Sequence, residues 1–130
     1  MIAVSGALAV AMMCHVHVPL RLERYHQVRA VWTGTIGARP VTCCVATAVL
    51  PGPVEDVIIG RCQVKHFRGR RRLRVFNDNS VVGGMICRQA RTGCCKLNAT
   101  ALPIMSYLPT GMVGSYECPH ETGTFTLTQQ

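Results

Sequence analysis

Short runs of apolar and β-branched residues, separated by glycine and proline, dominate the chain after residue 20. Apolar and polar positions alternate in several of these runs, whereas helical periodicity is weak. The runs that we expect to form strands are 28–32, 41–49, 57–67, 73–76, 81–87, 97–108 and 122–128. Many short strands with frequent turn signals are typical of an all-β sandwich or barrel.

The run 57–67 shows the alternation most clearly. Its apolar face carries Ile58, Cys62 and Val64, and its polar face carries Arg61, Gln63 and Lys65. Because successive side chains of a strand point to opposite faces, we expect the first face to be buried and the second to be solvated.

The first twenty residues have a different character. Residues 1–20 contain no Asp, Glu, Lys or Arg, and the part that ends at Met13 is almost wholly apolar. Such a run predicts a secretory signal peptide, with an uncleaved membrane anchor or a buried N-terminal element as the alternatives. The pairs of small residues lie inside the run, so the sequence leaves the cleavage position open. We expect a single domain over residues 28–128.

Composition narrows the class of protein. The chain has 130 residues, of which 48% are hydrophobic and 15% are charged. This balance excludes a disordered chain, and a coiled coil would need many more Glu and Lys residues. Lys and Arg number 14 against 6 Asp and Glu, which gives a formal net charge of +8.

Cysteine content indicates an oxidising compartment. The eight cysteines are Cys14, Cys43, Cys44, Cys62, Cys87, Cys94, Cys95 and Cys118. An even set of cysteines behind a signal-like segment predicts a disulfide framework, although loss of Cys14 with a signal would leave an odd thiol. Asn98 begins the tripeptide Asn-Ala-Thr, which is an acceptor for N-linked sugar. These features predict a secreted, disulfide-bonded glycoprotein.

Neither a metal site nor an enzyme motif is visible in the sequence. Local pairs such as Cys62 and His66 lack the Cys-x-x-Cys spacing of zinc sites, so disulfides or buried thiols are the favoured use. No Gly-x-Ser-x-Gly, phosphate loop or dinucleotide-binding motif occurs. The carboxylates include no pair placed for acid–base work. We therefore expect no enzymatic activity, no metal and no cofactor.

Residues 68–74 form the sharpest charge feature of the chain. The arginines of this basic run are Arg68, Arg70, Arg71, Arg72 and Arg74. They can neutralise the phosphates of a nucleic acid or bind a heparan-type polyanion. They can also form a mostly solvated hairpin at the edge of a sheet, where charge prevents pairing with another edge.

The stretch 104–118 contains Gly114-Ser115-Tyr116-Glu117-Cys118 and resembles an immunoglobulin variable-type domain. The resemblance implies an immunoglobulin-like antiparallel β-sandwich after the apolar N-terminal segment. It also implies that Cys43 or Cys44 is bonded to Cys118 and that Tyr116 anchors a corner of the sandwich. Leu108 takes the position of an apolar residue of the family. The lone Trp32 precedes the place where the family has its tryptophan.

Two functions follow as hypotheses. The resemblance implies a secreted or cell-surface glycoprotein module that binds a protein partner, either immune-receptor-like or a viral immune modulator, with residues 1–20 as its only membrane contact. The alternative is a small, basic, cysteine-rich intracellular protein, such as a viral accessory protein in the nucleus or cytoplasm. That protein would bind nucleic acid through residues 68–74.

Overall fold

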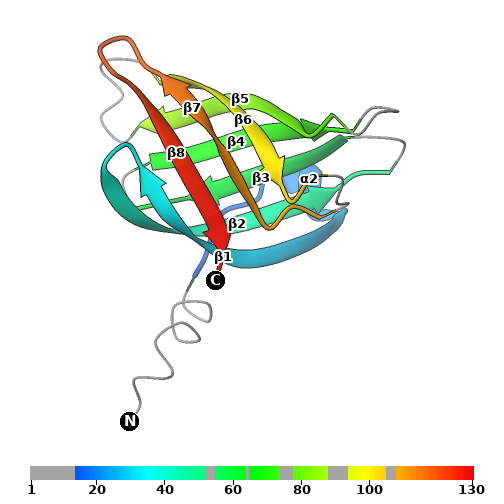
Figure 1. Cartoon of the computed structure of the whole chain (residues 1–130). Helices are drawn as coiled ribbons and strands as arrows, with labels where there is room; N and C mark the ends of the chain where they lie inside the picture. The colour runs from blue at the N-terminus through cyan, green and yellow to red at the C-terminus, as the bar shows by residue number, and fades with distance from the viewer. Residues whose placement is uncertain (1–13, 52–54, 64, 74–77, 88–93, 105–107) are drawn as a thin grey trace.

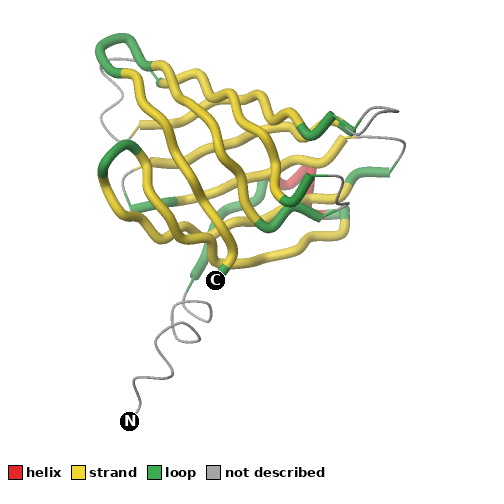
Figure 2. Tube along the Cα trace, viewed as in Figure 1, coloured by secondary structure: helices red, strands yellow, loops and turns green. Residues whose placement is uncertain are grey.

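Strands that follow one another in the chain pair with each other, and the first strand also pairs with the last. A computed structural model describes residues 14–51, 55–63, 65–73, 78–87, 94–104 and 108–130 (Figures 1 and 2). Its elements are α2 (Leu20–Glu23), β1 (His26–Ile36), β2 (Arg39–Val49), β3 (Glu55–Arg61), β4 (Lys65–Arg72), β5 (Ser80–Cys87), β6 (Cys95–Leu102), β7 (Gly111–Glu117) and β8 (Thr122–Gln129). All pairs are antiparallel, and the eight strands form a closed barrel.

Barrel closure overturns the predicted immunoglobulin-like sandwich, although the prediction of a mainly β protein is confirmed. β1 pairs with β2 and also with β8, from Trp32 opposite Gln129 to Ile36 opposite Phe125. A sandwich would instead keep two separate sheets packed face to face. The same alternation of apolar and polar residues fits both architectures, because each buries one face of every strand.

Gly34 lies where the first and last strands meet, opposite Leu127. A Cβ atom at this position would overlap the carbonyl oxygen of Thr126 on β8. The absence of a side chain at Gly34 therefore permits the close approach of backbones that closes the barrel.

The inward-facing residues of the strands fill the barrel. The buried members of this core are Trp32, Ile36, Val41, Cys43, Val45, Ile58, Cys62, Phe67, Val81, Met85, Cys95, Leu97, Ala101, Met112, Tyr116, Phe125 and Leu127. The ring of Phe67 lies over its cross-strand partner Gly60, where a Cβ would overlap it. Eight strands enclose just enough space for side chains or one small ligand.

A segment before β1 packs on the outside of the barrel. Val16, Val18 and Leu22 are buried against the outer face of β2 and β3, and α2 lies beside these strands (Figure 1). Cys14, Val16 and Val18 of the predicted signal or anchor thus contact the barrel, whereas residues 1–13 lie outside the described residues. Within the described ranges, no helix has the length and apolar character needed to cross a membrane.

Among the described residues, three disulfides join neighbouring parts of the fold and confirm the prediction of disulfide bonds. They are Cys14–Cys44, Cys43–Cys62 and Cys95–Cys118. The predicted bond from Cys118 to Cys43 or Cys44 is wrong, because β7 pairs with β6 and β8 and not with β2. Adjacent cysteines of one strand point to opposite faces, so Cys43 bonds inside the barrel and Cys44 bonds to the outer segment.

Several predicted strands differ from the observed ones. The run 57–67 is a hairpin rather than one strand, because β3 ends at Arg61 and β4 begins at Lys65. The predicted run 97–108 ends earlier, at Leu102. Most of the predicted strand 73–76 lies outside the described residues. Trp32, the lone tryptophan of the chain, is buried inside the barrel.

Candidate functional site

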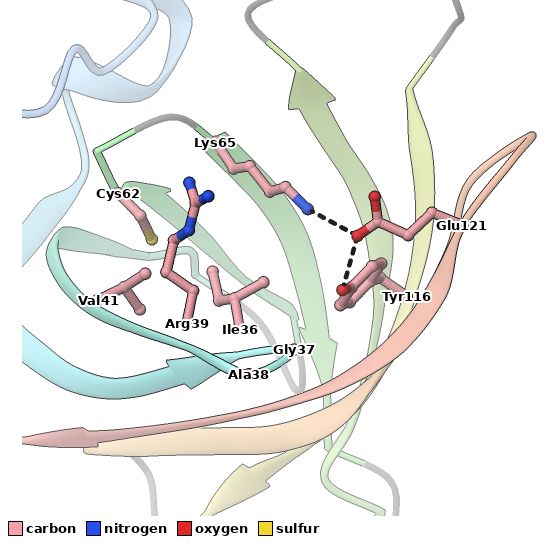
Figure 3. A pocket seen from close by; sticks show the side chains of 9 residues that line it. All are labelled: Ile36, Gly37, Ala38, Arg39, Val41, Cys62, Lys65, Tyr116 and Glu121. Atoms are coloured by element: carbon pink, nitrogen blue, oxygen red, sulfur yellow. Dashed lines mark hydrogen bonds and ion pairs between the residues drawn. The ribbon is translucent and has the colours of Figure 1, made fainter.

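A pocket of about 560 Å³ opens at one end of the barrel. Three connections meet there: the β1–β2 turn, the β3–β4 hairpin and the β7–β8 connection. The residues that line this mouth pocket are Ile36, Gly37, Ala38, Arg39, Val41, Cys62, Lys65, Tyr116 and Glu121 (Figure 3). The volume is in the range of small-molecule sites.

The wall of the mouth pocket is mainly apolar. Ile36 and Val41 contribute aliphatic surface from the β1–β2 hairpin, and Cys62 contributes the sulfur of its disulfide with Cys43. Large buried side chains such as Phe67 and Met112 occupy the barrel interior. The pocket is therefore confined to the barrel end.

Three polar side chains interact on one side of the pocket. The Tyr116 hydroxyl donates a hydrogen bond of 2.9 Å to Glu121 Oε1. Lys65 Nζ lies 3.6 Å from the same oxygen and 4.5 Å from the centre of the Tyr116 ring. Dashed lines in Figure 3 mark the two contacts of Glu121. Lys65 is thus held by a carboxylate and by the face of an aromatic ring.

Burial raises the pKa of the Tyr116 phenol, and the hydrogen bond to Glu121 and its negative charge add to this effect. The phenol therefore keeps its proton at neutral pH and acts as a donor. Lys65 and Tyr116 both contact Glu121 Oε1, and the Lys65 ammonium has further protons that can be donated to another acceptor.

Arg39 lies across the pocket from this group. Its side chain rises from the β1–β2 hairpin toward Lys65 in Figure 3. Among the residues that the structure describes, Arg39 forms no ion pair. The rim therefore carries two cations and one carboxylate around an apolar interior.

Two glycines make room for Tyr116. Gly37 in the β1–β2 turn has a φ of 63°, a left-handed conformation that favours glycine. A Cβ atom at Gly123, the cross-strand partner of Tyr116, would overlap the phenol ring. The aromatic side chain can thus lie flat against β8 and reach Glu121.

The structure changes the role expected of several predicted residues. Tyr116 lines the mouth pocket in a barrel, so it is not the corner anchor of a sandwich. Leu108 is exposed rather than part of an apolar core. Asn98 lies on the outer face of β6 with its side chain exposed, a position that leaves its predicted glycosylation open to enzymes.

The basic run is divided between the two faces of β4. Arg70 and Arg72 are exposed and Arg68 is half-buried, all on the outer face, whereas Arg71 points inward. The predicted hairpin at a sheet edge is wrong, because β4 pairs with strands on both sides. Arg74 lies outside the described residues.

Arg71 contradicts the prediction of a mostly solvated basic run. Its side chain is 0% exposed, it donates a hydrogen bond of 3.1 Å to Asn79 Oδ1, and it lies 4.0 Å from Asp56 Oδ2. Burial raises the pKa of Asp56 against the opposing effect of Arg71. Burial also lowers the pKa of Arg71, whereas Asp56 raises it. This buried polar cluster was not predicted from the sequence.

Arg39 and Glu121 were also not predicted as site residues from the sequence, and Lys65 was expected on a solvated face. No local motif marks these residues, because their proximity depends on three separate connections of the barrel. In the described part of the chain, no three His, Cys, Asp or Glu side chains cluster to hold a metal ion.

Comparisons with protein-family models, with curated proteins and with solved structures found no match to this chain.

Proposed function

We propose that this protein is an extracellular binding protein that holds a small amphipathic anion in the mouth pocket. The observation that carries the proposal is the combination of an apolar wall with the cations Arg39 and Lys65 at the rim. The apolar part of the ligand would replace water on Ile36 and Val41. Its acidic group would accept hydrogen bonds from the two cations.

The charge arrangement favours an anion over a neutral or cationic ligand. Glu121 is already engaged by Lys65 and Tyr116, so it offers little to a cation. Arg39 has a planar guanidinium, which suits a carboxylate or sulfonate. Binding, rather than catalysis, is the function that this set of residues supports.

The test uses anilinonaphthalene sulfonate, a fluorescent amphipathic anion, together with displacement by medium-chain fatty acids. We expect saturable binding of one probe molecule and its displacement by decanoate but much less by decanol. Val41→Phe, which adds bulk inside the pocket, should weaken binding at least tenfold. Val82→Phe adds the same group to an exposed position of β5 and should leave the affinity unchanged.

Arg39→Gln should weaken decanoate binding without affecting decanol. Equal effects of both Phe variants, or equal displacement by acid and alcohol, would show that the probe binds elsewhere or without charge selection. In either case the proposed ligand site is wrong.

The extracellular part of the proposal is supported by the three disulfides, which are compatible with such a location. The predicted glycan provides a separate test. When the full chain is expressed in mammalian cells, we expect secretion and a mobility shift after glycosidase treatment. Asn98→Gln should abolish the shift. Unmodified protein retained in the nucleus or cytoplasm would contradict the secretory route.

A further inference from the structure

The outer face of β4 carries a continuous row of basic side chains. The row consists of His66, Arg68, Arg70 and Arg72. Alternate residues of a strand repeat at about 6.7 Å, so the row extends over roughly 20 Å. A line of basic side chains at regular spacing, three of them arginines, matches a linear chain of anions better than it matches a compact ligand.

Neighbouring strands widen this row on both sides. Arg61 of β3 lies opposite His66. On the other side, Gly84 of β5 lies opposite Arg68, and Lys96 of β6 lies opposite Gly84. Burial lowers the pKa of Arg68, and the positive charge of Arg21 on α2 lowers it further, so the two side chains are close to each other. We call the surface formed by these cations and the row the basic strip.

Few carboxylates compensate the basic strip. Glu55 forms ion pairs with Arg70 at 2.9 Å and with Arg72 at 4.0 Å, which places it at one end. Glu117 lies opposite Lys96 on β7. Within the described ranges, Arg21, Arg61 and Arg68 form no ion pair. The centre of the strip thus holds unneutralised cations.

The strip is open to a long ligand at its centre. A Cβ atom at Gly84 would meet its nearest neighbour, the Cys95 carbonyl oxygen, only at 4.0 Å. Val82 and Ile86 flank Gly84 and are 55% and 60% exposed. These small and aliphatic side chains leave a shallow surface beside the arginine row.

We propose that the basic strip binds a sulfated polysaccharide of the heparan type. Sulfates along a linear sugar chain would contact successive arginines, and the release of counterions would drive the association. Arginine suits this role because its guanidinium donates paired hydrogen bonds to an oxyanion. This inference is independent of the ligand proposed for the mouth pocket.

Two observations favour the polysaccharide over nucleic acid. The outer faces of β4 and β5 contain no Phe, Tyr or Trp, whereas proteins that bind single strands use such rings to stack bases. The three disulfides are compatible with an extracellular location, where sulfated polysaccharides occur. The hypothesis of nucleic-acid binding through residues 68–74 becomes an outcome of the test.

The experiment measures the affinity of the full chain for a heparin oligosaccharide and for a duplex DNA of similar length, over a series of salt concentrations. Arg68→Gln and Arg61→Gln should each weaken heparin binding about twofold to fivefold, the range for one exposed ion pair. Gly84→Glu places a carboxylate beside Arg68, where space is available, and should weaken binding more. Glu55→Gln releases Arg70 and Arg72 and should strengthen it.

Arg24→Gln is the matched control. This exposed arginine stacks on Tyr25 beyond the end of α2, and its replacement changes the net charge by the same amount as Arg68→Gln. Its effect on heparin affinity should be clearly smaller. Thermal unfolding of each variant confirms that the barrel is intact.

Equal effects of Arg24→Gln and Arg68→Gln would mean that only net charge matters, and the basic strip would not be a site. Tighter binding to duplex DNA or RNA than to heparin would overturn the choice of partner in favour of nucleic acid. The proposal requires that the unmodified protein binds heparin and does not bind fully desulfated heparin.

Discussion

Arg71 is a fully buried cation close to one end of β4. The free-energy cost of burying its charge depends on the groups that contact it. Asn79 accepts a hydrogen bond from it, and Asp56 lies 4.0 Å away. Removal of a charge from water is expensive, and only well-placed partners offset this cost. The raised pKa of Asp56 shows that burial outweighs the attraction of Arg71. The pair is therefore sensitive to the loss of either member.

Replacement of Arg71 by Met should reduce the free energy of unfolding by roughly 3 kcal/mol at pH 7, because the Asp56 carboxylate is left buried without its counter-charge. The loss of Arg71 raises the folded-state pKa of Asp56 further. A raised pKa means that the folded state binds the proton more tightly than the unfolded state. The contribution of Asp56 to the free energy of unfolding therefore falls as the pH rises from its pKa in the unfolded state to its pKa in the folded state.

The destabilisation by Arg71→Met should consequently be smaller at pH 5 than at pH 7. Urea unfolding of the unmodified protein and of Arg71→Met at pH 5 and pH 7 measures this destabilisation. The effects of other titrating groups are the same in both proteins and cancel in the difference. Arg72→Met, on the exposed outer face of β4, should have little effect at either pH. A destabilisation by Arg71→Met that is the same at pH 5 and pH 7 would contradict the role given to Asp56.

Tyr116 provides a second prediction for a single residue. The chain has three tyrosines, and the raised pKa of Tyr116 predicts that one phenol titrates above the normal range. Absorbance at about 295 nm, where the phenolate absorbs, should show this deprotonation as a late step at high pH. Tyr116→Phe should abolish it, and Glu121→Gln should move it to lower pH because two of its causes involve Glu121. Persistence of the late step in Tyr116→Phe would assign it to another tyrosine.

At the scale of elements, alternation along the strands explains why neighbouring cysteines have different partners. Cys43 faces the core and bonds to Cys62, whereas Cys44 faces outward and bonds to Cys14. The same rule applies to β4, where Phe67 and Arg71 point inward and the basic residues next to them point outward. The alternating pattern was visible in the sequence, but the inward placement of Arg71 was not, because arginine is seldom buried.

The segment before β1 should contribute to stability through one side of α2. Leu22 is buried against the outside of the barrel, whereas Leu20 in the same helix is 81% exposed. Leu22→Ala should reduce the free energy of unfolding by about 2 kcal/mol or more, because it leaves a cavity between the segment and the sheet. Leu20→Ala, the same change on the exposed side, should be nearly neutral. Equal effects in denaturant unfolding would show that the segment does not pack as described.

At the scale of the whole molecule, the barrel depends on contacts between distant parts of the chain. β1 and β8 meet at its closure, and two disulfides join neighbouring strands or their ends within the wall. Together with the bond from Cys14 to Cys44, these disulfides close loops of 19 to 30 residues. Loops of this size correspond to about 3 kcal/mol of stabilisation through the unfolded state.

Peptide mapping under non-reducing conditions should therefore link Cys118 to Cys95 and Cys43 to Cys62. The reason is that each pair is held on neighbouring strands by the pairing of β6 with β7 and of β2 with β3. A peptide that links Cys118 to Cys43 or Cys44 would contradict the order of strands in the barrel and would restore the sandwich as the fold.

The sequence by itself determined that the protein is mainly β, disulfide-bonded and strongly basic, because these properties follow from local alternation and composition. Which strands pair, which cysteines bond and which charges meet was decided only by the tertiary structure. Alternation specifies that one face of each strand is buried, but it does not distinguish a closed barrel from two packed sheets. The pairing of β1 with β8 makes that choice. The barrel also brings Arg39, Lys65 and Glu121 to one opening, although they come from three separate connections of the chain.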